Sequence, residues 1–161
     1  MGLKAKWGAG LLVVILAAAG LLAFHGAAPE TAHSQTHYAR GPVRNDELDL
    51  LARLIQAEAE GEPYAGQVAV AAVILNRVQS PEFPNSISGV AYQPLAFESV
   101  MNGLIWRRNP TQEAYNAARD ALNGWDPTYG ATFFWNPSKP VSPWIWTRSI
   151  IVQIGNHVFA R

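Results

Sequence analysis

The chain has 161 residues and no cysteine, and its 12 Lys and Arg residues balance its 12 Asp and Glu residues. This length fits one domain with a short additional segment. The absence of cysteine excludes a disulfide framework, a thiolate metal site and a cysteine nucleophile. The formal net charge is zero, and no basic stripe of the kind that binds nucleic acid is present, so we expect no nucleic-acid partner.

Residues 1–28 have the pattern of an export signal. Lys4 and Lys6 precede an uninterrupted run of apolar and small residues over 8–24, and small residues follow at 26–28. This order is typical of a secretory signal peptide. The run is near the lower length limit of a spanning helix, so an uncleaved membrane anchor is the alternative. We therefore expect an exported protein that contacts the membrane only through this leader.

Residues 29–44 are polar and nearly free of aliphatic side chains, which predicts a flexible linker. The domain is expected over 45–161. Its first helix begins with Asn45 as the N-cap, because acidic residues follow in the first turn. Leu51, Ile55 and Glu58 continue the helix at three- and four-residue spacing. A Gly and a Pro at 61 and 63 end it.

Two more helices follow along the chain. Residues 64–79 carry apolar side chains all round the axis, which predicts a buried central helix. Residues 80–93 are expected to form a loop with at most one short helical turn. A third helix is predicted from Asn109, as the cap, to Leu122. Residues 131–135 and 157–160 are expected to be strands. The sum is a mostly helical α+β domain with a small antiparallel sheet.

Glu58 is the first candidate for chemistry, because it continues the inward stripe of the first helix. It also lies in the last turn, where the helix dipole disfavours a carboxylate. Partial burial, the dipole and the neighbouring acids Glu60 and Glu62 all act to raise its pKa. A general acid needs a carboxyl group that is still protonated near neutral pH. A solvated acidic helix end is the alternative reading of the same spacing.

Histidine content narrows the chemistry further. The predicted domain contains a single histidine, His157. A zinc amidase or peptidase needs at least two, so no metal is expected. No serine lies in the context of a nucleophile elbow, and we expect His157 to be structural. Carboxylate chemistry remains.

Aromatic residues are concentrated in the second half of the domain. Trp144 and Trp146 follow a Ser-Pro pair, and Trp135 precedes Asn136-Pro137. Aromatic faces beside amide and hydroxyl groups suit sugar rings, which have apolar C–H faces and polar edges. The alternative for these tryptophans is an aromatic-rich core.

Together these segments resemble the catalytic domain of the spore cortex-lytic, germination-specific cell-wall hydrolases. The matching segments are 58–64 (EAEGEPY), 66–78 (GQVAVAAVILNRV), 83–90 (FPNSISGV), 96–97 (AF), 124–127 (GWDP), 134–137 (FWNP), 144–148 (WIWTR) and 154–159 (IGNHVF). The resemblance covers nearly all of residues 45–161. It implies a lysozyme-like fold that cleaves peptidoglycan glycan strands without a cofactor, with Glu58 as the catalytic acid.

The resemblance also implies a lytic transglycosylase, in which one glutamate acts as acid and then as base. Two alternatives stay open: muramidase-type hydrolysis with Glu62 or Glu98 as a second carboxylate, and a non-catalytic glycan-binding domain. Glu60 and Glu98 depart from the family pattern, which usually has an arginine and a hydroxyl residue there. The residues expected to bind substrate are Glu62, Phe97, Glu98, Trp135, Asn136, Trp144 and Trp146. Protein partners are not indicated.

Overall fold

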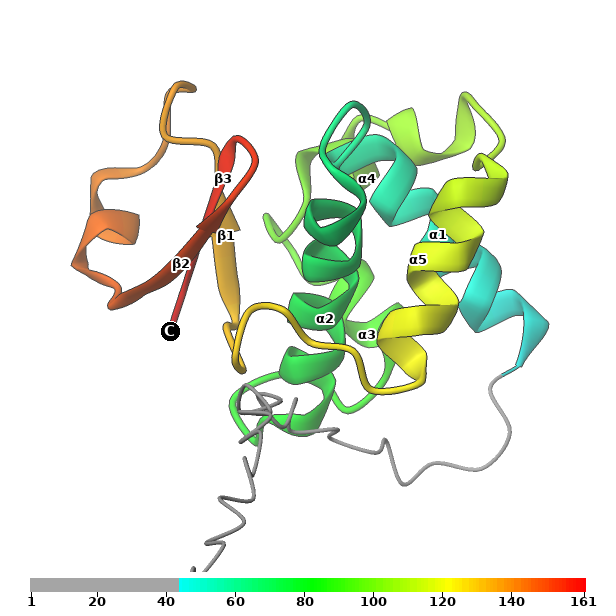
Figure 1. Cartoon of the computed structure of the whole chain (residues 1–161), viewed down its shortest axis with the longest axis horizontal. Helices are drawn as coiled ribbons and strands as arrows, with labels where there is room; N and C mark the ends of the chain where they lie inside the picture. Colours follow the sequence, from blue (N-terminus) through cyan, green and yellow to red (C-terminus); the bar gives the residue numbers. More distant parts are fainter. Residues whose placement is uncertain (1–43) are drawn as a thin grey trace, which may run out of the picture. The chain divides into compact units, whose positions relative to one another are not determined.

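A computed structural model describes residues 44–161, and the expected leader and residues 29–43 of the expected linker lie outside this range. The elements are α1 (Asn45–Glu58), α2 (Tyr64–Gln79), α3 (Ile87–Ala91), α4 (Glu98–Met101), the 3-10 helix η1 (Leu104–Trp106), α5 (Gln112–Leu122), β1 (Phe133–Trp135), the 3-10 helix η2 (Pro143–Thr147), β2 (Ile150–Ile154) and β3 (His157–Ala160) (Figure 1). None of the described helices is long and apolar enough to cross a membrane.

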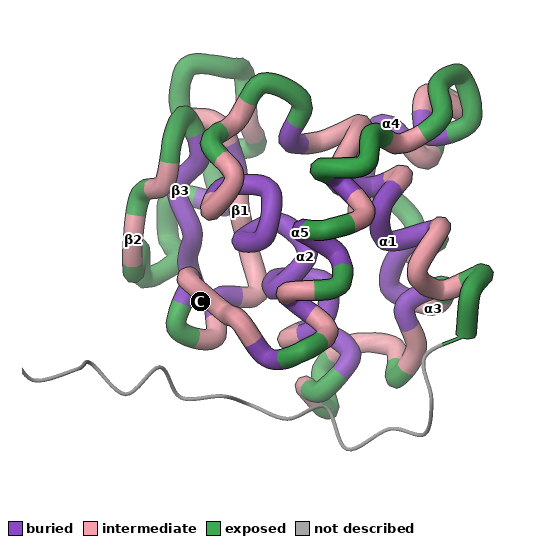
Figure 2. Tube along the Cα trace, turned by 45° about the vertical axis from the view of Figure 1, so that its right-hand side comes forward, coloured by how far each residue is buried: buried purple, intermediate pink, exposed green. Residues whose placement is uncertain are grey.

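Helix α2 is the centre of the helical core. Residues 68–74 have no exposed surface, and α1, α3 and α5 all pack against this helix. Figure 2 shows it as a buried element inside more exposed surroundings. The sequence predicts this helix with the same bounds, because a helix with apolar side chains on every face must be enclosed on every face.

The three strands form an antiparallel sheet in the order β1-β3-β2. Its two faces differ, because successive side chains of a strand point to opposite sides. Phe134 and Phe159, which are partners in the register, pack into the helical core. Trp135 and Val158 point the other way and form a second cluster with Ile145 of η2. The sheet therefore lies between the helices and the segment 136–149.

Several predicted boundaries are wrong. The N-cap of α1 is Arg44 and not Asn45. Helix α5 begins at Gln112, because the hydroxyl of Thr111 accepts a hydrogen bond from the Ala114 N–H at 3.1 Å and makes Thr111 the cap in place of Asn109. The first predicted strand starts two residues late, at Phe133.

Strand β2 was not predicted at all. It runs along an edge of the sheet and pairs only with β3. Its exposure does not alternate cleanly along the strand, and Ile150 and Ile151 are both exposed. A strand without this alternation gives no period-two signal in the sequence.

Candidate active site

Glu58 is the last residue of α1 and lies on the stripe of this helix that faces the core. Ile55 and Leu51, about one and two turns earlier, are almost completely and completely buried, and Glu58 itself is partly buried. The helix ends immediately after it, where the Ala59 N–H donates to the Ile55 carbonyl at 2.8 Å. The carboxyl group is thus held at the edge of the core.

The pKa of Glu58 is raised, chiefly because burial disfavours the charged carboxylate. Hydrogen bonds from Ser99 and the positive charge of Lys139 act in the opposite direction, and the negative charge of Glu98 adds to the rise. The predicted direction of the pKa shift agrees with this. The expected source of repulsion was wrong, since Glu60 forms a two-bond ion pair with Arg108 at 2.6 Å and Glu98 is the acid that acts on Glu58.

Ser99 is the direct partner of the acid. Its hydroxyl donates a hydrogen bond to Oε1 of Glu58 at 2.5 Å. Ser99 belongs to α4, which the buried ring of Phe97 anchors from the preceding position. Phe97 packs on Phe134 of the sheet at 6.3 Å between ring centroids. Phe97 therefore supports the site from inside the core, whereas Glu98, the next residue, is exposed.

Sequence reasoning missed Ser99 and Lys139. For Ser99, the only indication in the sequence is its position two residues after Phe97, because an apolar side chain buried just before a helix fixes the place of the first residues of that helix. Lys139 lies in a turn after β1, in which its N–H donates to the Asn136 carbonyl at 3.1 Å and the Asn136 side chain accepts from the Ser138 N–H at 2.8 Å. No pattern within either segment shows that they meet near Glu58.

The three tryptophans expected to bind substrate divide into one buried and two exposed side chains. Trp135 is buried, and Trp146 stands edge-on to it with ring centroids 5.4 Å apart. Trp144 is packed edge-on against Phe133 at 5.7 Å, with the Arg148 guanidinium over its ring at 5.6 Å. Both exposed indoles are half accessible, at 51% each. Trp135 thus supports Trp146 and Phe133 supports Trp144, so the segment after β1 presents two packed aromatic side chains.

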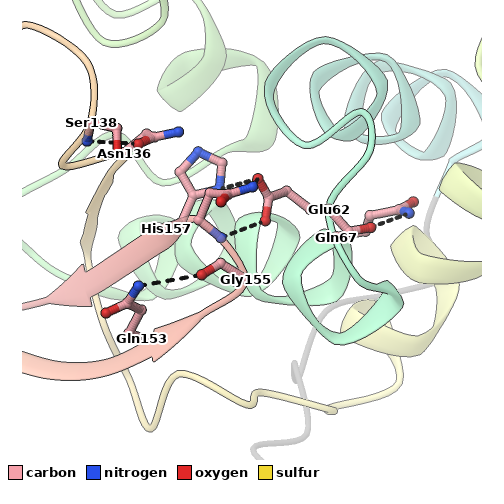
Figure 3. Close-up of polar contacts among 8 residues, drawn as sticks. Glu62, Gln67, Asn136, Ser138, Gln153, Gly155 and His157 are labelled. Atoms are coloured by element: carbon pink, nitrogen blue, oxygen red, sulfur yellow. Dashed lines mark hydrogen bonds and ion pairs between the residues drawn. The ribbon is translucent and has the colours of Figure 1, made fainter.

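Glu62 binds the turn between β2 and β3 (Figure 3). Its carboxylate accepts the backbone N–H of Asn156 at 2.9 Å and the Asn156 side-chain amide at 3.0 Å, one bond at each oxygen. Its side chain is only 7% exposed. A Cβ added at Gly155, where φ is +59°, would lie 2.1 Å from Oε2 of Glu62. This close fit favours a structural part for Glu62, joining the start of α2 to the sheet.

His157 lies beside Glu62 and is buried. Its Nδ1 is 3.6 Å from Oε1 of Glu62, and its ring packs edge-on against Phe134 at 5.4 Å. Burial lowers the pKa of the imidazole, while Glu62 acts to raise it and Lys139 to lower it. The burial and aromatic packing of the ring favour the structural part expected for it. Within residues 44–161, no three His, Asp or Glu side chains are grouped in a way that would hold a metal ion.

Comparison with known proteins places this arrangement in a family. Residues 61–160 match the model of the family described as Cell Wall Hydrolase. The chain is 51% identical over 121 residues to the spore cortex-lytic enzyme of Bacillus subtilis, a match that covers 75% of this chain and 39% of that protein. The chain thus spans well under half the length of this relative.

Solved structures give the same result. The catalytic domain of the Bacillus cereus SleB protein has 48% sequence identity and a TM-score of 0.70, with 76% of this chain and 94% of that one covered. The catalytic domain of the germination-specific lytic transglycosylase SleB from Bacillus anthracis has 47% identity and a TM-score of 0.71, with 76% and 99% covered. The expected lysozyme-like α+β fold is confirmed. The chain belongs to the cell wall hydrolase family.

Proposed function

We propose that this domain cleaves the glycan strand of peptidoglycan, in spore cortex or cell wall, during germination or wall remodelling, and that Glu58 is its proton donor. The observation that carries the proposal is a partly buried carboxyl group whose pKa is raised by burial and which receives a hydrogen bond from Ser99. The similarity to a germination-specific lytic transglycosylase supports this assignment.

The proposed chemistry uses Glu58 twice. Protonated Glu58 donates its proton to the glycosidic oxygen as the bond from this oxygen to C1 of muramic acid breaks. The 6-hydroxyl of the same sugar then attacks C1, and the Glu58 carboxylate removes the hydroxyl proton. A 1,6-anhydro end forms and Glu58 regains its proton. Ser99 and Lys139 stabilise the carboxylate between the two steps, since both favour its charged form.

Hydrolysis with a second carboxylate is the alternative. It requires another acid to activate water, with the two carboxyl groups roughly 6.5–9.5 Å apart for inversion. Both oxygens of Glu62 accept hydrogen bonds from Asn156, which leaves Glu62 poorly placed for this task. Glu98 is exposed and its charge acts on Glu58, so Glu98 is the better candidate.

The remaining substrate-binding assignments are part of the same proposal. Trp144 and Trp146 present exposed faces for sugar rings, and Asn136 lies in the turn that brings Lys139 near the acid. Trp135 and Phe97 are buried. We propose that Trp135 holds Trp146 in place and that Phe97 holds Ser99 in place, rather than that either contacts the substrate. A non-catalytic glycan-binding domain is the less favoured possibility, because such a domain has no use for a proton donor like Glu58.

Replacing Glu58 by Gln tests the proposal. The substitution removes the proton donor and little volume, so release of wall fragments is expected to fall by roughly 10²–10⁴-fold, with the melting temperature at least as high as that of the parent. Mass spectrometry of the fragments released by the parent should find 1,6-anhydro ends. If all the released fragments carry reducing ends, hydrolysis is favoured. A similar loss of fragment release in Glu98→Gln would then identify Glu98 as the second carboxylate. Near-parental activity of Glu58→Gln would remove Glu58 from the mechanism.

We also propose that the protein acts outside the cytoplasm, after export by residues 1–28, which lie outside the described residues. The order of lysines, apolar residues and small residues supports export. Fractionation of cells that express the full chain should find it in the wall or membrane fraction. Recovery in the cytoplasmic fraction would contradict this.

A further inference from the structure

Trp106 is an exposed indole in a segment of the helical part of the domain. It belongs to η1, between α4 and α5, and this segment lies away from the strands (Figure 1). Its side chain is 56% exposed, whereas the preceding Ile105 is buried. The guanidinium of Arg53 lies over its ring, 5.1 Å from the centroid. One face of the indole is thus supported by a cation–π contact.

The support beneath this indole is itself fixed. Arg53 donates to Asp49 at 2.7 Å and to the carbonyl oxygens of Ile105 at 3.4 Å and Arg108 at 3.3 Å. Asp49 in turn accepts a hydrogen bond from the hydroxyl of Tyr115. Immobilising a long side chain normally costs about 0.5–1.5 kcal/mol on binding. The contacts of Arg53 already order its side chain in the free protein. Binding of a ligand to the indole above it therefore does not have to immobilise Arg53.

A small hollow adjoins the platform formed by Trp106 and Arg53. Its volume is about 40 Å³, and Arg53 lines it as well as supporting the indole. Ala57, Leu104 and Ile105 form its apolar wall, and Gln56 and the Glu60–Arg108 ion pair form its polar side. A methyl group beside an amide matches this lining, which is the chemistry of an acetamido group. N-acetylated sugars carry such a group on a ring whose C–H face stacks on an indole.

A free positive charge lies next to the indole. Arg107 follows Trp106 in the chain and is exposed, and its guanidinium makes no ion pair or hydrogen bond within the described part of the chain. Arg108 differs, because Glu60 neutralises it through two hydrogen bonds of 2.6 Å. A guanidinium without a partner favours carboxylates, which peptide stems attached to a wall glycan supply.

We propose that Trp106, Arg107 and the adjoining hollow form a second, non-catalytic binding site for N-acetylated, carboxylate-bearing wall glycan. The inference rests on the proposed function for its choice of ligand. Arg53 precedes Glu58 by five residues, which turns it about 140° around the axis of α1. The site therefore lies on a different side of α1 from the acid, and it holds the domain on the wall without occupying the space where cleavage occurs.

Binding to purified, insoluble peptidoglycan tests the site, with the full chain carrying Glu58→Gln so that the wall stays intact. In this background Trp106→Ala should raise the Kd measured by co-sedimentation by about fivefold, as expected for the loss of one stacking contact. Trp106→Phe should retain most of the affinity. Arg107→Glu should weaken binding, whereas Arg119→Glu, an equal change of charge on α5, should alter it much less.

The outcomes separate this site from the proposed function. Release of wall fragments by the parent chain, with Glu58 in place, reports cleavage independently of the binding measurement. Parental affinity of a folded Trp106→Ala variant overturns the second site, whether or not the parent cleaves the wall. If Trp106→Ala lowers the melting temperature too far to be measured, Arg107→Glu decides: parental affinity of that variant overturns the site, and weaker binding than that of Arg119→Glu supports it.

Discussion

Replacing Ser99 by Ala removes the side-chain hydrogen bond to the proposed acid and leaves the backbone hydrogen bond from Ser99 in place. The hydroxyl donates to Oε1 of Glu58 at 2.5 Å, and Ser99 is 4% exposed, so bulk water does not replace it. A hydrogen bond to a charged group contributes about 1.5–3 kcal/mol. If the bond stabilises the carboxylate formed after proton donation, its loss should slow cleavage by about 10- to 100-fold.

The same substitution has a signature in pH that a merely structural role lacks. The bond from Ser99 lowers the pKa of Glu58, so its removal leaves burial less opposed and raises this pKa further. Glu58 donates a proton only while protonated, and the alkaline limb of the profile of kcat/KM should therefore move to higher pH. Rates of fragment release, measured over about pH 5–9, give both effects. Ser99→Thr keeps a hydroxyl and should restore much of the rate, and Ser88→Ala removes an exposed one as a control. A slower Ser99→Ala variant with an unmoved alkaline limb would refute this reasoning.

Other substitutions test the surroundings of the site. Asn156→Ala removes a side-chain bond to Glu62 at 3.0 Å and should lower the free energy of unfolding in urea by about 1–3 kcal/mol; an unchanged midpoint would mean that Glu62 does not hold the β2–β3 turn. Trp146→Ala should weaken binding to insoluble wall beyond any loss of stability, and a lower melting temperature alone would make Trp146 part of the core around Trp135. Glu58→Gln should raise the melting temperature more at about pH 8 than at about pH 4, because burial raises the folded pKa of this carboxyl and ionisation above its unfolded pKa costs stability. Equal differences at both pH values would contradict that burial.

Helical periodicity carried most of what could be predicted. The spacing of Leu51, Ile55 and Glu58 places them on one side of α1 whatever that helix packs against, so the partial burial of Glu58 follows from three- and four-residue steps. The bounds of α2 follow from the same logic. The start of α5 was predicted wrongly, with Asn109 as the cap in place of Thr111. The contact of the Thr111 N–H with Gln56 at 2.9 Å spans 55 positions, so the local sequence does not show it.

Contacts between distant segments could not be predicted in this way. Ser99 reaches Glu58 across 41 positions, and Asn156 reaches Glu62 across 94. Each of these side chains lies in a segment whose own pattern is unremarkable, and only the packing of that segment decides what it meets. Lys139 is the clearest case, because the turn that places it depends on where β1 ends.

The three acids at the end of α1 show how packing assigns different parts to residues of one type. Their spacing predicts mutual repulsion as a reason for a raised pKa at Glu58. In the folded domain, Glu60 is neutralised by Arg108 and Glu62 is bound by Asn156, so each of the two outer acids has its own partner. Burial is then the main cause of the raised pKa of Glu58. Because burial does not depend on the charge state of the neighbours, we expect the pKa of Glu58 to stay raised when Arg108 or Asn156 is replaced. Mutations at these two positions should therefore act on stability before they act on the proposed chemistry.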